Sequence, residues 1–195
     1  MAGKPARERL LQVAQEIVTD VGAAHMTLDT VSAKAGVSKG GLLYHFPTKE
    51  ALIRALIKSY IANSHEVILR ELGRQPKGSL REIKAHIVAV AKRDARTKRL
   101  GAALLLAAAH DPKLLAPARK EFRRTFLRYD AAGKNSVRAA EIALACDGLH
   151  MLELLGLMPF DERRRAEMVR HMVRLVDAYE KDTSNDHLPK ARRRP

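Results

Sequence analysis

The sequence predicts an all-α protein, and two observations support that fold class. Apolar residues recur at three- and four-residue steps through most of the 195-residue chain, beginning with Leu10, Ala14 and Ile17. This spacing places them on one face of a helix. Sustained alternation, which indicates strands, is nearly absent, as are Asn-Gly and Asp-Gly turns between β-branched runs. The periodicity predicts about nine helices and no sheet.

Two helices are expected at the start of the chain. Residues 10–21 carry the first apolar stripe, and Gly22 follows at the position where a glycine closes a helix. Residues 28–35 carry a shorter stripe, with Thr27 as a candidate N-cap and Gly36 as the closing residue. These boundaries predict two helices joined by a short loop.

A third short helix and a long fourth one are expected next. Ser38 can cap residues 39–45, and Pro47 prevents continuation because it lacks an amide hydrogen and restricts the residue before it. Thr48 can then cap a helix over residues 49–73, whose apolar stripe is long and unbroken.

The rest of the chain also has helical periodicity. A loop is expected at residues 73–79, GRQPKGS, because it holds Gly, Pro and Ser. Pro117 should kink or delay one of the later helices. The expected helices cover residues 79–95, 98–110, 112–129, 136–156 and 161–181, and the tail KARRRP is expected to be disordered.

Two adjacent glycines, Gly40 and Gly41, lie inside the third helix, where each costs roughly 1 kcal/mol relative to alanine. Helix two, the turn at Gly36 and helix three form a helix-turn-helix, whose second helix is suited to the DNA major groove. Glycines there allow close approach to DNA. Leu42 and Phe46 are expected to hold helix three on the core. Tyr44 is expected to contact DNA, and the alternative is a packed aromatic residue whose hydroxyl bonds within the chain.

The segment resembles the TetR family of bacterial transcriptional regulators. The resemblance covers residues 7–55 and includes Gly36, Val37, Ser38, Lys39, Gly40, Leu42, Tyr44, Phe46, Lys49 and Leu52. It implies a DNA-binding domain at residues 1–48, an effector-binding and dimerisation domain at 49–183, and a basic tail at 184–195. The DNA contacts that it implies are Thr27, Lys39, Gly40, Gly41, Tyr44, His45 and Lys49.

Composition restricts the other classes of function. The formal net charge of +14 suggests an anionic partner, but Lys and Arg exceed Asp and Glu mainly in residues 51–100. A single cysteine, Cys146, excludes an internal disulfide. The apolar run at residues 100–109 is about half the length that a membrane span requires, and the N-terminus lacks a signal-peptide pattern. A cytoplasmic protein without membrane contact is expected.

Two other classes remain as alternatives. A helical protein could use the basic segment 51–100 to bind an acidic protein. A metalloenzyme would need ligands such as Glu82 with His86, or Glu167 with His171, but neither pair forms a recognised zinc motif. No Walker A, GxSxG or GxGxxG sequence is present. No enzyme activity, catalytic residue, metal or cofactor is therefore expected.

The expected function is a ligand-responsive repressor that leaves its operator DNA when a small molecule binds. Aromatic residues make up 4% of the chain, so an apolar or anionic effector is favoured over a cation held in an aromatic cage. Effector-facing candidates, each of which could equally be a core residue, are Tyr60, Ser64, Leu104, Ala108, Phe122, Phe126 and Met151. A homodimer is expected, with an interface from Ala139, Ala143, Leu144, Met151, Leu155, Met168, Met172 and Val176, in a four-helix bundle across the two-fold axis.

Overall fold

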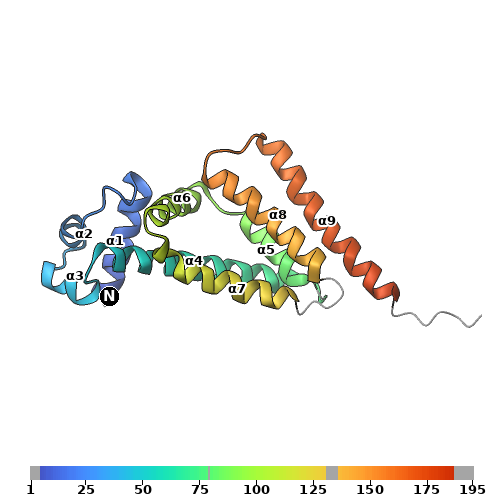
Figure 1. Cartoon of the computed structure of the whole chain (residues 1–195), viewed down its shortest axis with the longest axis horizontal. Coiled ribbons are helices and arrows are strands. Elements are labelled where there is room, and N and C mark those ends of the chain that lie inside the picture. The colour runs from blue at the N-terminus through green and yellow to red at the C-terminus, as the bar shows by residue number, and fades with distance from the viewer. Residues whose placement is uncertain (1–4, 79, 131–135, 187–195) are drawn as a thin grey trace, which may run out of the picture. The chain divides into compact units, whose positions relative to one another are not determined.

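The structure is a computed structural model that describes residues 5–78, 80–130 and 136–186, and all regular secondary structure within these ranges is helical (Figure 1). The predicted all-α class is confirmed. The KARRRP tail lies outside the described residues. The elements are α1 (Ala6–Val21), α2 (Leu28–Ala35), α3 (Lys39–His45), α4 (Lys49–Arg74), α5 (Arg81–Ala91), α6 (Ala95–His110), the 3-10 turn η1 (Pro112–Leu115), α7 (Ala116–Asp130), α8 (Ser136–Leu154) and α9 (Glu162–Asp186).

The boundary between α5 and α6 differs from the sequence prediction. The expected helix over residues 79–95 ends at Ala91, and Asp94 is the N-cap of α6, where its carboxylate accepts a hydrogen bond of 2.7 Å from the Thr97 amide. The amides of the first helical turn have no carbonyl acceptor within the helix, and the Asp94 side chain supplies one for Thr97. Pro117 lies in the first turn of α7, where its missing amide hydrogen costs nothing.

Internal contacts divide the chain into two units. The first contains residues up to Ser64 together with Arg93–Phe122, and the second contains His65–Lys92 together with the chain from Arg123 onward. Helices α4 and α7 are continuous and contribute residues to both units. The expected domain boundary after residue 48 stays a prediction.

The first unit is held by a core that α1 forms with α2, α3 and α6. Leu42 and Phe46, on the inner face of α3, are 0% and 3% exposed, which confirms their predicted core role. The remaining fully enclosed large side chains of this core are Leu10, Val18, Met26, Val31, Leu52 and Leu56.

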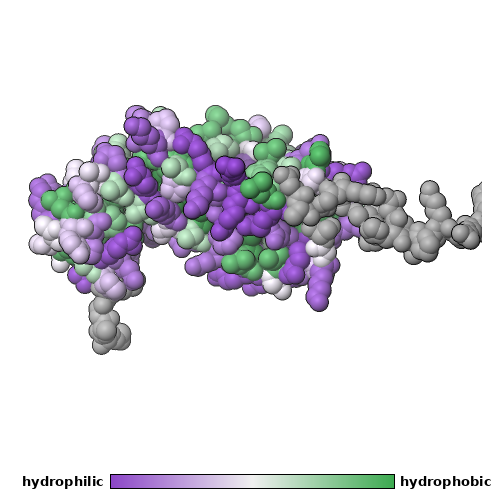
Figure 2. All heavy atoms as spheres, turned by 60° about the horizontal axis from the view of Figure 1, so that its bottom comes forward, coloured by the Kyte–Doolittle hydropathy of each residue, from purple (hydrophilic) through white to green (hydrophobic). Residues whose placement is uncertain are grey.

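The second unit has its own core, where α5 packs on α8 and α9 and α8 packs on α9. Its fully enclosed large side chains are Leu80, Ile83, Ile87 and Val176. Cys146 is buried in this core. On the face drawn in Figure 2 most side chains are hydrophilic, and hydrophobic side chains gather in several patches between them. No helix among the described residues is long and apolar enough to cross a bilayer.

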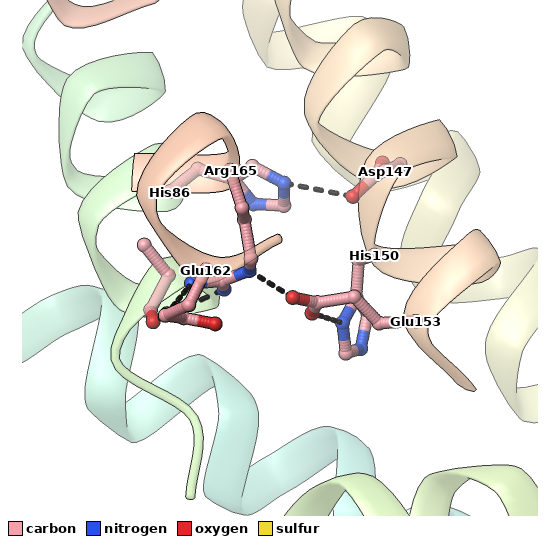
Figure 3. Close-up of polar contacts among 7 residues, drawn as sticks. His86, Asp147, His150, Glu153, Glu162 and Arg165 are labelled. Carbon is pink, nitrogen blue, oxygen red and sulfur yellow. Dashed lines mark hydrogen bonds and ion pairs between the residues drawn. The ribbon is translucent and has the colours of Figure 1, made fainter. Parts of the chain in front are cut away.

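A buried polar network joins α5, α8 and α9 in the second unit (Figure 3). Arg165 donates to the Glu153 carboxylate, to Glu162 Oε1 at 3.1 Å and to the Ala91 carbonyl at 3.3 Å. His150 Nδ1 lies 3.5 Å from the second oxygen of Glu153. The Arg165 and Glu153 side chains are each 8% exposed, so the pair is shielded from water.

A buried ion pair adds little net stability, but its separation is costly because one charge stays buried without compensation. Replacing Arg165 with methionine should therefore lower the free energy of unfolding by about 3–5 kcal/mol. Arg164→Met is the matched control, because Arg164 is exposed and pairs with Glu167 at the surface, where such pairs contribute about 0–1 kcal/mol. Urea unfolding measures both variants. Equal losses would contradict a special role for Arg165.

Candidate nucleic-acid interface

The turn between α2 and α3 is set by local hydrogen bonds. The Thr27 hydroxyl accepts from the Thr30 amide at 3.0 Å, and the Thr30 hydroxyl accepts from the Thr27 amide at 3.1 Å, which forms a capping box. Gly36 closes α2 at φ 62°, a left-handed conformation that favours glycine. Ser38 Oγ then accepts from the Gly41 amide at 3.1 Å and starts α3.

Burial of one side of α3 leaves its other side exposed. Because Leu42 and Phe46 are enclosed, Tyr44 points outward and is 84% exposed, and Leu43 is 38% exposed. The Arg7 guanidinium covers the Phe46 ring at 5.4 Å from its centroid. An aromatic side chain as exposed as Tyr44 contributes nothing to the core, so it is available for a contact outside the chain.

The two glycines of α3 have different surroundings. A Cβ at Gly40 would meet nothing within 4 Å, whereas a Cβ at Gly41 would lie 3.1 Å from Val37 Cγ1 and 3.2 Å from Ser38 Oγ. A side chain at position 41 would therefore require Val37 and Ser38 to shift by a few tenths of an ångström. Of the two, Gly40 alone has the open surroundings that close approach to DNA requires.

Lys39 is held at the start of α3 by an ion pair with Asp29 on α2, with 2.9 Å between the charged atoms. Both side chains are more than half exposed, so the pair contributes at most about 1 kcal/mol and holds Lys39 only weakly. Sequence reasoning missed Asp29, because no local spacing relates residues on two different helices.

Three other predicted DNA contacts have partners within the chain. Lys49 Nζ donates to the Ala24 carbonyl at 3.0 Å and so ties α4 to the loop before α2. Thr27 belongs to the capping box. His45 is half-buried, with its ring 5.1 Å from that of Tyr44 in an edge-on arrangement. The structure therefore gives each of these residues a local role in addition to the predicted one.

The predicted effector-facing residues are divided between the two units. Leu104 and Ala108 are buried in the first core, so they are core residues, the alternative that the sequence left open. Ser64 donates to the Tyr60 carbonyl at 2.8 Å within α4. The last three have unlike surroundings, since Phe126 packs on Tyr129 in the second unit, while Phe122 and Met151 are 51% and 41% exposed.

The predicted dimer-interface residues differ in how much of their surface is free, and the interface itself stays a prediction. Ala139, Ala143, Met172 and Val176 are buried within the chain's own second core, and they have almost no surface for a second copy. Met168 packs against that core and is half-buried. On α8, Leu144 is 60% exposed, and after that helix Leu155 is 45% exposed. Periodicity alone could not separate these two faces, because α8 is apolar on both.

The Glu82 and His86 side chains, one of the two pairs considered as possible metal ligands, have other partners. His86 Nε2 lies 2.9 Å from Asp147 Oδ1 on α8 (Figure 3), and Glu82 accepts from Arg128 at 3.0 Å. Throughout the described part of the chain, no three His, Cys, Asp or Glu side chains meet in a way that could hold a metal ion.

An exposed second helix on a well-packed helix-turn-helix defines a DNA-binding regulator, and the comparisons agree. Residues 10–56 match the model for bacterial regulatory proteins of the tetR family, and residues 81–177 match the tetracyclin repressor-like C-terminal domain. Together the two models span most of the chain. The protein belongs to the TetR family of transcriptional regulators.

Relatives and solved structures agree with this assignment. The chain is 25% identical over 182 residues to the HTH-type transcriptional regulator BetI of Escherichia coli K12, covering 86% of this chain and 91% of BetI. Its fold is similar to that of a regulator, SCO7518, from Streptomyces coelicolor A3(2), with a TM-score of 0.69, 20% identity and coverage of 88% and 98%. The multidrug binding protein EbrR in complex with imidazole gives a TM-score of 0.66 at 22% identity, with coverage of 87% and 96%.

The two glycines provide a matched pair of substitutions. Gly40→Ala should raise stability by about 0.5–1 kcal/mol, because alanine favours the helix and space is free, while it weakens operator binding by adding a methyl group on the exposed side. Gly41→Ala should give no such gain, because Val37 and Ser38 must move. Thermal unfolding and a DNA-binding titration measure both effects. Unchanged operator affinity in Gly40→Ala would contradict close approach at this residue.

Proposed function

We propose that this protein is a repressor that binds operator DNA as a homodimer and is released by a small-molecule effector. The observation that carries the proposal is the outward face of α3, where Tyr44 is 84% exposed on a helix anchored by Leu42 and Phe46. Family membership supports DNA binding in general, and the exposed tyrosine indicates which residues make the contact.

In the proposed complex α3 enters the major groove. Gly40 allows the helix backbone to approach the DNA, Tyr44 contacts a base edge or a phosphate, and Lys39 leaves Asp29 for a phosphate. Lys49 and Thr27 act mainly by holding the loops around α2 in place. The charge of +14 adds affinity that does not depend on sequence.

A homodimer is proposed because a helix-turn-helix protein reads two half-sites, one with each copy. The exposed stripe of α8 supports a second copy as the occupant, since Val137, Leu144 and Met151 are 68%, 60% and 41% exposed and lie on one helical face. Leu155, just beyond α8, extends this stripe. The interface proposed now consists of these exposed residues, without the buried ones.

Release by an effector requires a conformational change that reaches the DNA-binding helices. Helix α4 follows α3 in the chain and runs without a break into the second unit. A displacement of α4 can therefore change the distance between the two α3 helices of the dimer. The ligand needs only to bind the released conformation more tightly. EbrR, a structural relative, has been solved with imidazole and with ethidium, which supports effector binding by this fold.

The first test is DNA binding at about 150 mM salt, where charge alone gives weak affinity without sequence preference. The DNA flanking the protein's own gene should bind about a thousandfold better than a scrambled fragment. Tyr44→Ala should weaken the specific complex by roughly tenfold to a hundredfold. Lys120→Ala, which removes an exposed charge on α7, serves as the control and should have little effect.

Equal affinity of the wild type for the two fragments would contradict operator recognition at that locus. If the protein then also bound an acidic protein in a salt-sensitive manner, the result would favour the alternative in which the basic segment 51–100 binds a protein partner. Loss of specific binding in Lys120→Ala, with none in Tyr44→Ala, would contradict the assignment of α3.

The dimer is tested with a charged residue on the exposed α8 stripe. Leu144→Glu should convert a dimer to a monomer in sedimentation equilibrium, because an unpaired carboxylate cannot be buried in an apolar interface. Leu106→Glu is the matched control, since Leu106 is 58% exposed and belongs to α6, which contributes no residue to this stripe, and this variant should remain a dimer. A wild-type monomer, or a dimeric Leu144→Glu, would contradict the interface.

A further inference from the structure

The outward side of α3 carries one large aliphatic side chain. Leu43 is 38% exposed, and it lies outside both hydrophobic cores of the described part of the chain. The other leucine of this helix, Leu42, is fully enclosed, so the anchoring of α3 does not depend on Leu43. Leu43 thus adds apolar surface to the side of the helix that is proposed to meet DNA.

Helical spacing places Leu43 beside the other groups of this side. Leu43 lies four residues after Lys39, and Tyr44 lies four residues after Gly40, so the two pairs form adjacent rows along the helix. Leu43 also lies three residues after Gly40, where an added methyl group would meet nothing within 4 Å. The missing side chain at Gly40 therefore allows a base edge to come close to Leu43.

The composition of α3 limits how it can read base edges. Its seven residues, KGGLLYH, include no arginine, asparagine or glutamine, the side chains that bind two atoms of one base. They also include no acidic side chain that could accept from cytosine. The hydroxyl of Ser38, the N-cap, already accepts from the Gly41 amide. Base selection by this helix therefore depends on few polar groups, and an apolar contact becomes important.

Thymine is the base that presents an apolar group in the major groove. It carries a 5-methyl group there, whereas cytosine and adenine present amino groups and guanine presents two acceptors. A leucine against the methyl group removes apolar surface from water on both molecules. Against the other bases, the leucine would remove water from a polar group without replacing its hydrogen bond, which is unfavourable. Both effects favour a thymine opposite Leu43.

We infer that Leu43 selects a thymine in each operator half-site through contact with the 5-methyl group of that base. This inference rests on the proposed function, because it names a base that the proposed operator contains. Burial of Leu42 and Phe46 prevents rotation of α3 about its axis, so Leu43 keeps a fixed place on the outward side. A side chain on a fixed helix distinguishes bases better, because the helix cannot turn to place another residue against the base.

The first experiment identifies the operator by selection. Duplexes that bind the wild-type full chain are enriched from a pool of random sequence at about 150 mM salt, where charge alone gives no sequence preference. The enriched sequences should contain, in each half-site, a thymine that Leu43→Ala no longer selects. Leu106→Ala is the matched control, because Leu106 is another exposed leucine on α6, and it should select the same sequences as the wild type.

The second experiment removes only the methyl group. Each thymine of the selected duplex is replaced in turn by deoxyuridine, which keeps every polar atom of the base. One such replacement in a half-site should weaken wild-type binding by about fourfold, the effect of one buried methyl group. Leu43→Ala should bind both duplexes equally, which completes a double-mutant cycle that assigns the loss to this contact. Leu43→Met, which conserves apolar volume, should retain part of the preference for thymine.

The outcomes separate this inference from the proposed function. Specific sequences in which no deoxyuridine replacement weakens wild-type binding, or a thymine preference that Leu43→Ala retains, would overturn the inference and leave operator binding intact. A selection without any enriched sequence would contradict the proposed function, and the inference with it. Circular dichroism checks that Leu43→Ala is folded, as expected because alanine favours a helix and Leu43 lies outside both cores. The deoxyuridine measurement on the wild type does not depend on any variant.

Discussion

The anchoring of α3 by two side chains determines what the N-terminal helices can do. A helix of 7 residues has too few internal hydrogen bonds to be stable alone, and burial of Leu42 and Phe46 supplies about 1.5–3 kcal/mol each. Because both residues face inward, the helix cannot rotate about its axis. The orientation of Tyr44 toward solvent, and hence its availability to DNA, is a consequence of this packing.

Buried polar groups in this protein are satisfied to different extents. In the second unit, Arg165, Glu153 and His150 satisfy one another, and the network joins α5, α8 and α9. The Tyr60 hydroxyl in the first unit and Arg81 Nε in the second are buried without a hydrogen-bond partner among the described residues. A closed network favours one arrangement of the helices, whereas an open hydrogen-bonding group leaves free energy to be gained by binding.

The positive charge of the chain favours DNA binding but does not select a base sequence. The excess of lysine and arginine is largest in residues 51–100, beyond the helix-turn-helix, and residues 1–50 have 6 basic against 5 acidic residues. Phosphate attraction of this kind depends on salt and not on base sequence. Selection of an operator must then come from close contacts at α3, where Gly40 and Tyr44 are open to solvent.

Local patterns in the sequence determined the helical class, the caps at Thr27 and Ser38, and the core role of Leu42 and Phe46, because caps and periodicity act over a few residues. Only the tertiary structure decided the tasks of residues whose partners are distant in the sequence. Lys49 reaches a carbonyl 25 positions away, and Lys39 pairs with Asp29 on another helix. The same reason explains why the inner and outer faces of α8 could not be separated beforehand, since both are apolar and only packing against α5 and α9 buries one of them.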